Sequence, residues 1–222
     1  HLLSRRQRQM CIRDRKHNYD ETDFKGALQI AFEHDNTLLI EKFIPGREFR
    51  IFIINDEVVG ILHRVPANVT GDGVLNIGQL IDRKNEDPLR GKGYRTPLEK
   101  IRKGREEEMF LKQQGMDFNT VPKEGEVVYL RENSNISTGG DSIDFTDDID
   151  DSYKAIAVEA AKALNVKITG LDMMIQDIHA PATPDNYAII EMNFNPAIHI
   201  HCYPFKGKNR HLNHKMIRAL GF

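Results

Sequence analysis

Apolar and polar residues alternate along several stretches of the chain, and this two-residue period is typical of β-strands. The β-like stretches are TLLIEKFI at 37–44, REFRIFII at 47–54, EVVGILHRV at 57–65, EVVYL at 126–130, GLDMMIQDI at 170–178 and YAIIEMN at 187–193. Turn signals, Pro45-Gly46 and Asn55-Asp56, separate the first three stretches. The pattern therefore predicts an antiparallel meander over residues 37–65.

Apolar residues at helical spacing predict helices at 23–35, 76–87, 97–115 and 152–166, with a last helix near 209–222. Thr22 and Asn76 are residue types that cap helix N-termini, whereas Pro97 is placed to begin a helix and Gly115 to end it. Together with the strands, these helices predict an α+β fold in which antiparallel sheets are flanked by helices.

Three polar side chains interrupt the last two apolar strands. Alternation places Tyr187, Ile189, Glu191 and Asn193 on one face, and Asp172 converges with Glu191 and Asn193 if the two strands are neighbours. Two carboxylates and an amide are the oxygen donors that Mg²⁺ prefers. Charged residues at a strand end are also commonly exposed to solvent. The strand pattern alone therefore favours a metal site and a solvent-exposed sheet edge equally.

A second polar cluster follows the 126–130 strand. Arg131 leaves this strand close to Asn133 and Asn135, within the segment RENSNISTGGDS. An arginine beside several amides and hydroxyls is suited to holding a carboxylate or a phosphate. Asn and Gly also form turns for purely structural reasons, so a structural loop is the alternative.

Composition limits the function classes. The 222-residue chain is 40% hydrophobic and 29% charged with a net charge of −2, which predicts a folded core and gives no sign of bulk nucleic-acid binding. No apolar run reaches the roughly 18 residues of a membrane span, and no signal peptide is visible. Two cysteines, Cys11 and Cys202, form no disulfide framework and suit a reducing cytoplasm, where we expect the protein.

Residues 1–17 differ in character from the rest. They contain six lysine or arginine residues and one aspartate. A basic arm for nucleic acid or membrane is one interpretation. RQRQMCIRDR also resembles translated sequencing-adapter sequence, so we interpret residues 1–17 as a non-native segment or a disordered basic arm.

Several ordered motifs resemble one family. EKFIPGRE, HRVPANVTGDG, DPLRGKGYRTPLEKI, YLRENSNISTGGDSID and EMNFNPAIHIH are similar to the ATP-grasp module of bacterial bifunctional glutathione synthesis proteins. In that family a glutamate–cysteine ligase is fused to a glutathione synthetase-like ATP-grasp domain. The resemblance runs from about Tyr19 to Phe222 and identifies 18–222 as the C-terminal portion of an ATP-grasp domain, a partial ATP-grasp fold. PANVTGDG and the NSNISTGGDS segment also look similar to cyanophycin synthetase.

The resemblance implies an ATP-dependent carboxylate–amine ligase. γ-Glutamylcysteine would be phosphorylated on its C-terminal carboxylate, and the amine of glycine would attack the acyl phosphate to give glutathione, ADP and phosphate. The implied cofactors are ATP and two Mg²⁺ ions, with Mn²⁺ as a substitute. The implied partners are these small substrates and the fused ligase domain, without nucleic acid or membrane, and a homodimer is compatible.

The resemblance also assigns residues. The hinge Glu41, Lys42, Phe43 and Ile44 would face adenine, and Glu48 would bond the ribose hydroxyls. Two metal ions would use the three strand-end donors, Asp172, Glu191 and Asn193.

The implied oxyanion needs a fixed cation. Arg131 is the first candidate, with Asn133 and Asn135 as positioning donors, and Arg64 is the second. His199, which we place on one face with His201, would line the peptide site or simply be hydrogen-bonded.

The family also uses a phosphate-contacting lysine and a glycine-rich lid, and nothing before Asp20 resembles either. We therefore expect this chain to carry the hinge and metal ligands without being an efficient ligase by itself. Ordinary turnover of γ-glutamylcysteine, glycine and ATP by purified residues 1–222 would contradict that expectation. The alternatives are another ATP-grasp peptide ligase, such as a cyanophycin-type enzyme, and a non-catalytic nucleotide-binding module.

Overall fold

The computed structural model describes residues 25, 28, 29, 32, 36, 37, 44–93 and 95–222. Two compact units divide the chain, His1–Ile44 and Pro45–Phe222. The predicted arm at 1–17 lies outside the described residues, and so does most of the predicted helix at 23–35 and strand at 37–44. Within the described ranges, no helix is both long and apolar enough to cross a membrane.

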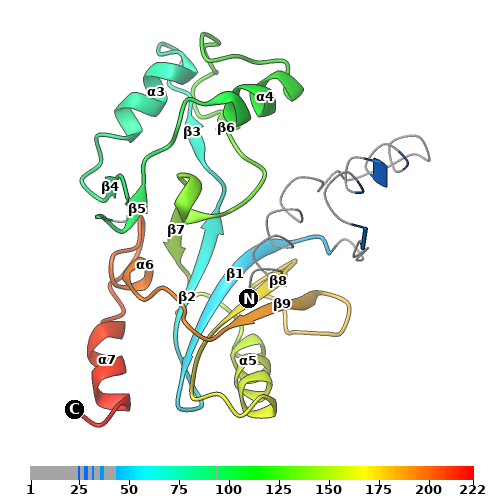
Figure 1. Cartoon of the computed structure of the whole chain (residues 1–222), viewed down its shortest axis with the longest axis vertical. Helices are drawn as coiled ribbons and strands as arrows, with labels where there is room; N and C mark the ends of the chain where they lie inside the picture. The colour runs from blue at the N-terminus through cyan, green and yellow to red at the C-terminus, as the bar shows by residue number, and fades with distance from the viewer. Residues whose placement is uncertain (1–24, 26–27, 30–31, 33–35, 38–43, 94) are drawn as a thin grey trace. The chain divides into compact units, whose positions relative to one another are not determined.

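A five-stranded sheet forms the centre of the second unit (Figure 1). The strands, in the order β7-β2-β1-β8-β9, are all antiparallel to their neighbours: β7 (Asp141–Asp144), β2 (Glu57–Val65), β1 (Arg47–Ile54), β8 (Ile168–Ile175) and β9 (Tyr187–Asn193). Asn55 and Asp56 join β1 to β2 with φ of 47° and 65°. These left-handed angles match the twist of a two-residue hairpin, so the predicted turn is confirmed.

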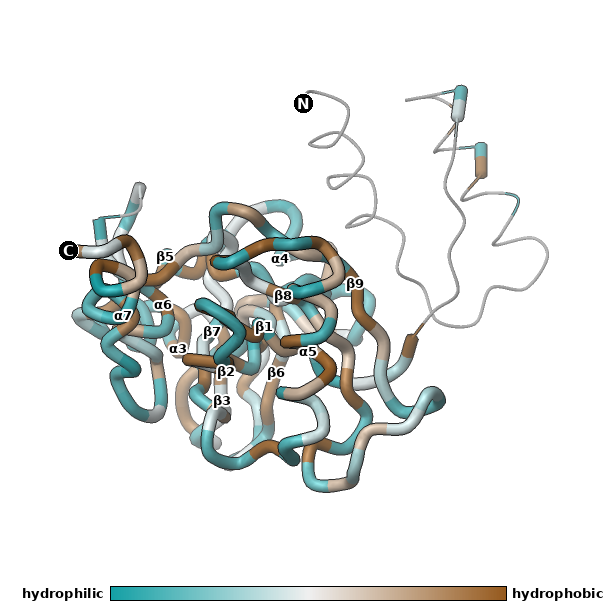
Figure 2. Tube along the Cα trace, turned by 90° about the horizontal axis from the view of Figure 1, so that it is seen from below, coloured by the Kyte–Doolittle hydropathy of each residue, from teal (hydrophilic) through white to brown (hydrophobic). Residues whose placement is uncertain are grey.

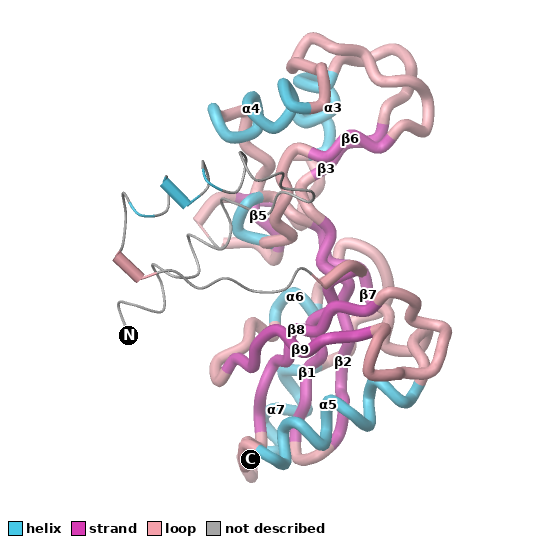
Figure 3. The backbone as a smooth tube through the Cα atoms, turned by 90° about the vertical axis from the view of Figure 1, so that its right-hand side faces the viewer, coloured by secondary structure: helices cyan, strands magenta, loops and turns pink. Residues whose placement is uncertain are grey.

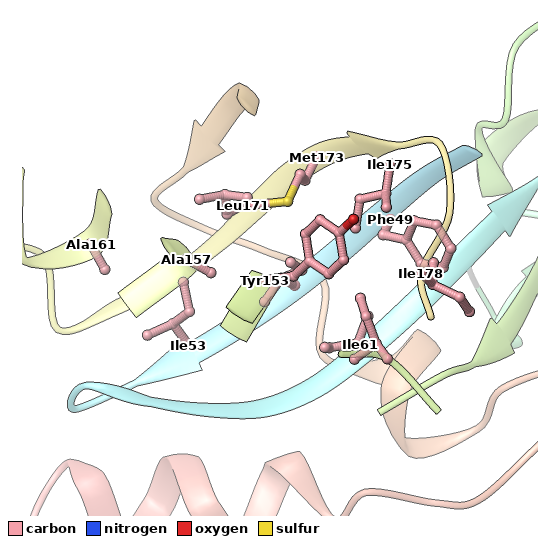
Figure 4. Packing of buried hydrophobic residues seen from close by; sticks show 12 residues of the cluster. Phe49, Ile53, Ile61, Tyr153, Ala157, Ala161, Leu171, Met173, Ile175 and Ile178 are labelled. Carbon is pink, nitrogen blue, oxygen red and sulfur yellow. The ribbon is translucent and has the colours of Figure 1, made fainter. Parts of the chain in front are cut away.

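One face of the sheet packs on helix α5 (Asp151–Ala163), as Figure 4 shows. Alternate β1 residues, Phe49, Ile51 and Ile53, are buried there against Tyr153 and Ala157 of the helix. Asp150 begins α5 by accepting a hydrogen bond from the Ser152 N–H. The amphipathic pattern predicted for 152–166 is therefore confirmed as the main core helix.

The opposite face of β1 has two halves. Phe52 and Ile54 are covered by α6 (His199–Cys202) and α7 (Leu212–Ala219), through Cys202 and Leu212. Glu48 and Arg50, earlier on the same strand, are polar and lie in the half of this face that the apolar cluster does not include. The functional residues described below come from that half.

A smaller subdomain is inserted between β2 and β7. It contains β3 (Asn68–Thr70), α3 (Ile77–Lys84), β4 (Arg90–Gly91), β5 (Leu98–Glu99), α4 (Arg105–Gln113), β6 (Val127–Tyr129) and the short 3₁₀ helix η1 (Ile136–Thr138). Figure 3 shows α3, α4, β3 and β6 gathered together. Their apolar faces form a separate core around residues such as Ile81, Leu111 and Leu130.

The helix predicted at 97–115 is wrong in its first half. Leu98–Glu99 pairs in parallel with Arg90–Gly91, and α4 begins only at Arg105. Gly104 precedes the helix, and its N–H donates to the Glu107 carboxylate at 2.9 Å. The Glu107 side chain thus satisfies the N–H of the residue that precedes α4. This cap sets the start of the helix at Arg105 and not at Pro97.

Candidate active site

A β-bulge places the acidic side chains of the two last strands on one face. Asp172 pairs with Glu191 and Gly170 pairs with Asn193, but Met173 pairs with Ile189, so Ile190 is the extra residue. Directly paired residues share a face, so Glu191 and Asn193 lie on the side of Asp172. The expected grouping of Tyr187 and Ile189 with Glu191 is wrong, since the bulge reverses the alternation between them.

The three predicted metal-ligand residues therefore project from the same side of two adjacent strands. Asn193 Nδ2 donates to Glu191 Oε1 at 3.0 Å. Gly170 makes room between them and β1, because a Cβ there would lie 3.0 Å from Arg50 Cδ and 2.7 Å from Pro196 Cβ. Among the described residues no cluster of three or more His, Cys, Asp or Glu side chains could hold a metal; this set has two carboxylates and an amide.

Asp172 is the buried centre of an ionic network. Its side chain is 4% exposed and accepts hydrogen bonds from Arg50 Nε, from Arg50 Nη2 at 2.8 Å and from Arg64 Nη2 at 3.0 Å. Arg64 Nη2 also pairs with Glu48, whose other carboxylate oxygen accepts from the Ser134 hydroxyl. Two arginines and two acids thus neutralise one another on this face of the sheet.

The electrostatics favour an ionised Asp172. Burial by itself raises the pKa of this carboxyl, but the hydrogen bonds from Arg50 and the charges of Arg64 and Arg50 outweigh it. The pKa of Asp172 consequently lies below its usual value. At neutral pH the carboxylate is charged and is oriented by two fixed guanidinium groups.

The donor set suits a hard cation that also contacts phosphate. Mg²⁺ takes one or two carboxylates and completes its coordination with water and phosphate oxygens, and Asp172, Glu191 and Asn193 supply two carboxylates and an amide on one face. Arg64 Nε is buried without a hydrogen-bond partner, so a guanidinium donor next to Asp172 has unused capacity for an anion. On donor chemistry, the side chains fit a metal–nucleotide site.

A cavity of about 180 Å³ adjoins this network. Arg50 and Arg64 form one wall, and three of the residues singled out from the sequence, Arg64, Asn135 and His199, line it together. They come from β2, from the residue before η1 and from α6, which are far apart in the chain. The structure therefore brings together the second catalytic candidate and two of the predicted substrate-binding residues.

Arg131 and Asn133 have other contacts. The Arg131 guanidinium pairs with Glu106 and, at 2.5 Å, with Glu107 of α4. Asn133 Oδ1 accepts from the Thr138 hydroxyl at 2.9 Å and from the Asn135 N–H at 3.4 Å, which shapes the loop. Neither residue lines the cavity beside Arg64.

Of the four residues predicted to form the adenine-facing hinge, the structure describes only the last. Glu41, Lys42 and Phe43 lie outside the described residues, and Ile44 is a half-buried residue at the end of the first unit. Glu48, predicted to bond ribose, is described, and its carboxylate is paired with Arg64 and Ser134.

His199 and His201 do not share a face as expected, because they lie on helix α6 rather than on an extended segment. His199 lines the cavity and is exposed. His201 is fully buried against Phe52, and neither ring nitrogen has a partner. Burial lowers the pKa of His201 to about 3, with the charge of Arg50 acting in the same direction, so its ring is neutral.

Sequence reasoning missed Arg50 and Ser134. Arg50 is two residues after Glu48 on the same strand, so alternation alone would have placed both on one face. Ser134 lies in the polar loop that had been noticed, but its contact with Glu48 joins residues 86 apart in sequence. Only the first of these had a local signal.

Comparisons with known proteins agree on one family. The glutathione biosynthesis bifunctional protein of Desulfotalea psychrophila is 62% identical over 207 residues, covering 93% of this chain and 27% of that protein. The protein of the same name from Clostridium perfringens is 57% identical over 202 residues, or 91% of this chain and 26% of its own length. No protein-family model matches the chain.

A solved structure gives the same result. The crystal structure of a bifunctional glutathione synthetase from Pasteurella multocida aligns with a TM-score of 0.76 at 43% identity, covering 93% of this chain and 30% of that one. The α+β arrangement of antiparallel sheets and flanking helices is thus confirmed. The chain is similar to bifunctional glutathione biosynthesis proteins over a segment that is about a quarter of their length.

Proposed function

We propose that this chain supplies the metal-binding and acyl-activating part of an ATP-dependent ligase that joins γ-glutamylcysteine to glycine. The observation that carries the proposal is the placement of Asp172, Glu191 and Asn193 on one face of β8 and β9, beside two arginines. Oxygen donors next to guanidinium groups are suited to a metal–nucleotide complex and the carboxylate that it phosphorylates.

Each residue has a role in this proposal. Asp172, Glu191 and Asn193 hold Mg²⁺, which, when bound, neutralises charge as the γ-phosphoryl group is transferred. Arg64 donates to the activated carboxylate and then to the oxyanion that forms when an amine attacks it. Arg50 keeps Asp172 oriented through two hydrogen bonds.

Arg64 is a better placed cation than Arg131 for this role. Its guanidinium lies at the cavity and beside Asp172, and its Nε has unused donor capacity. Arg131 is held between two carboxylates of α4, where its charge anchors that helix. Two Mg²⁺ ions, a fused glutamate–cysteine ligase, a homodimer and a cytoplasmic location are the finer parts of the proposal.

A segment exchange tests the proposed activity. The matched 207 residues of the Desulfotalea psychrophila protein would be replaced by the corresponding residues of this chain, which are 62% identical. We expect the hybrid to form glutathione and ADP from γ-glutamylcysteine, glycine and ATP. Glu191→Gln should reduce the rate by about 100-fold or more, because it removes a carboxylate from the metal site.

The matched control is Glu159→Gln, an exposed glutamate on α5, against the other face of the sheet. This control should retain the rate of the unmodified hybrid. A hybrid that melts like the relative but forms no glutathione, or equal rates for the two variants, would contradict the proposed function.

A further inference from the structure

Two separate segments of the smaller subdomain form walls of the cavity beside Arg50 and Arg64. The β5 wall consists of Pro97 and Glu99, and the η1 wall consists of residues 135–137. The two walls are far apart in the sequence. Contacts between them, rather than chain connectivity, therefore set the width of the cavity.

Arg90 of β4 is a side chain that joins the two walls. Its Nη1 donates to the carbonyl of Glu99 at 2.8 Å and to the carbonyl of Gly139, the cap residue at the end of η1, at 3.0 Å. A guanidinium Nη carries two hydrogens, so both of them connect one wall with the other. Arg90 is not among the described residues that line the cavity, so it acts on the walls from outside.

The end of η1 also packs closely on the chain just after β5. Gly139 has a φ of 94°, and a Cβ there would lie 2.8 Å from Ile101 Cα, so this close approach requires glycine. Ile101 is held in turn by Asn85, whose side chain accepts from the Ile101 N–H at 2.8 Å and donates to its carbonyl at 2.9 Å. The two walls thus meet at a close backbone contact, which the hydrogen bonds of Arg90 complete.

The guanidinium group that joins the walls is anchored to the central sheet. Arg90 Nη2 pairs with the Asp141 carboxylate at the start of β7, and the Arg90 side chain is fully buried. Asp141 lies opposite Val65 of β2, the residue after Arg64. Phe205 covers the cation, with Arg90 Cζ 5.5 Å from the ring centroid. Arg90 is therefore fixed relative to the strand that carries Arg64.

Lys84 of α3 binds the same carboxylate but not the walls. Its ammonium group donates to Asp141 Oδ2 at 2.7 Å, and to the carbonyl and the side-chain oxygen of Asn68 at 2.9 and 3.0 Å. None of these three hydrogen bonds reaches the β5 wall or the η1 wall. Arg90 and Lys84 thus share the ion pair that holds the smaller subdomain on the sheet, whereas Arg90 also bonds both walls.

We propose that Arg90 is a positioning residue for the ligase reaction, which sets the distance between the β5 wall and the η1 wall from outside the cavity. Its planar fork reaches the Glu99 carbonyl, the Gly139 carbonyl and the Asp141 carboxylate together, whereas a lysine would supply the charge without that geometry. This inference rests on the proposed function, because it takes the cavity beside Arg64 as the place where the reaction occurs.

Hydrogen exchange of the isotopically labelled full chain tests the contact itself. The variant is Arg90→Lys, which keeps a positive charge beside Asp141 and removes the planar fork. The amides of Lys100 and Gly139 make backbone hydrogen bonds beside the two walls, and that of Leu130 makes one in the separate core of the smaller subdomain. We expect the first two amides to exchange at least tenfold faster in the variant, and the third to change less than about twofold.

The matched control is Lys84→Met, which removes the other cation beside Asp141 and keeps both bonds from Arg90 to the walls. It should change the exchange of all three amides by the same factor, because a general loss of stability opens the whole subdomain. The proposal would be overturned if Arg90→Lys also changed all three amides equally, changed none of them or failed to fold. Each of these results would make Arg90 a structural ion-pair partner.

Kinetics of the segment-exchanged protein test the consequence for catalysis. A misplacement of about 1 Å can cost about 100-fold, so Arg90→Lys should lower kcat by about 10- to 100-fold, and Lys84→Met should leave it within about threefold. An unchanged kcat in Arg90→Lys would overturn the positioning role and leave the proposed function standing. An unmodified hybrid that forms no glutathione would refute the proposed function together with the positioning role, even if the exchange rates show that Arg90 joins the walls.

Discussion

Replacing Asp172 by asparagine is expected to lower the free energy of unfolding by about 3–5 kcal/mol. The substitution removes the charge that faces Arg50 and Arg64, whose side chains are only 9% and 12% exposed. The two buried guanidinium groups would then share a single carboxylate, Glu48, and an uncompensated buried charge costs far more than the loss of an exposed ion pair. Urea denaturation followed by circular dichroism would measure the difference.

The same prediction has a definite pH dependence. The pKa of Asp172 is depressed below its ordinary value of 3.8, so its stabilisation is fully present above that pH and is lost as the pH falls through the folded-state pKa. The stability gap between the unmodified chain and Asp172→Asn should therefore be constant near neutrality and narrow below about pH 4. The control is Asp185→Asn, which changes an exposed acid in the β8–β9 loop and should leave the free energy of unfolding nearly unchanged. A gap under about 1 kcal/mol at pH 7 would contradict the buried network.

Replacing Arg64 by glutamine is expected to reduce glutathione formation by about 100- to 1,000-fold in the segment-exchanged protein. A preorganised donor at a developing oxyanion contributes that much. Arg64, like Arg50, lies at the cavity and beside Asp172, and its Nε is a buried donor without a hydrogen-bond partner. Steady-state kinetics with saturating ATP would show the loss mainly in kcat, because the interaction strengthens in the transition state.

Arg83→Gln is the matched control for this prediction. Arg83 is 54% exposed and pairs with Asp72 in the smaller subdomain. It should leave kcat within about twofold, since an exposed ion pair contributes little. A loss confined to KM for ATP, with kcat unchanged, would assign Arg64 to ground-state binding and contradict its proposed catalytic role.

The sequence predicted the large elements because each has a local cause. The β1–β2 hairpin follows from apolar alternation on either side of Asn55-Asp56, and α5 follows from its amphipathic spacing. The convergence of Asp172 with Glu191 was also predictable, since it required only the assumption that the two strands are neighbours in the sheet.

Other features depended on contacts that no local pattern contains. The bulge at Ile190 arises from the pairing register of β8 with β9. It places Tyr187 and Ile189 on the face opposite to the one that alternation predicted. Figure 2 shows hydrophobic colouring on part of β9, where Ala188, Ile189 and Ile190 follow one another without a polar residue between them, so hydropathy gives no sign of the change of face. The pairing of Arg131 with α4 joins residues 24 and 25 positions apart and was equally invisible in the local sequence.

The most direct test of the central claim is the position at which a divalent cation binds. Mn²⁺, added with ATP to the isotopically labelled full chain, should broaden the amide signals around Asp172 on β8 and around Glu191 and Asn193 on β9 together. Glu191→Gln should abolish the broadening on both strands, and Glu159→Gln should preserve it. Broadening that is absent from these strands, or that persists in Glu191→Gln, would show that the three oxygen donors do not form a metal site.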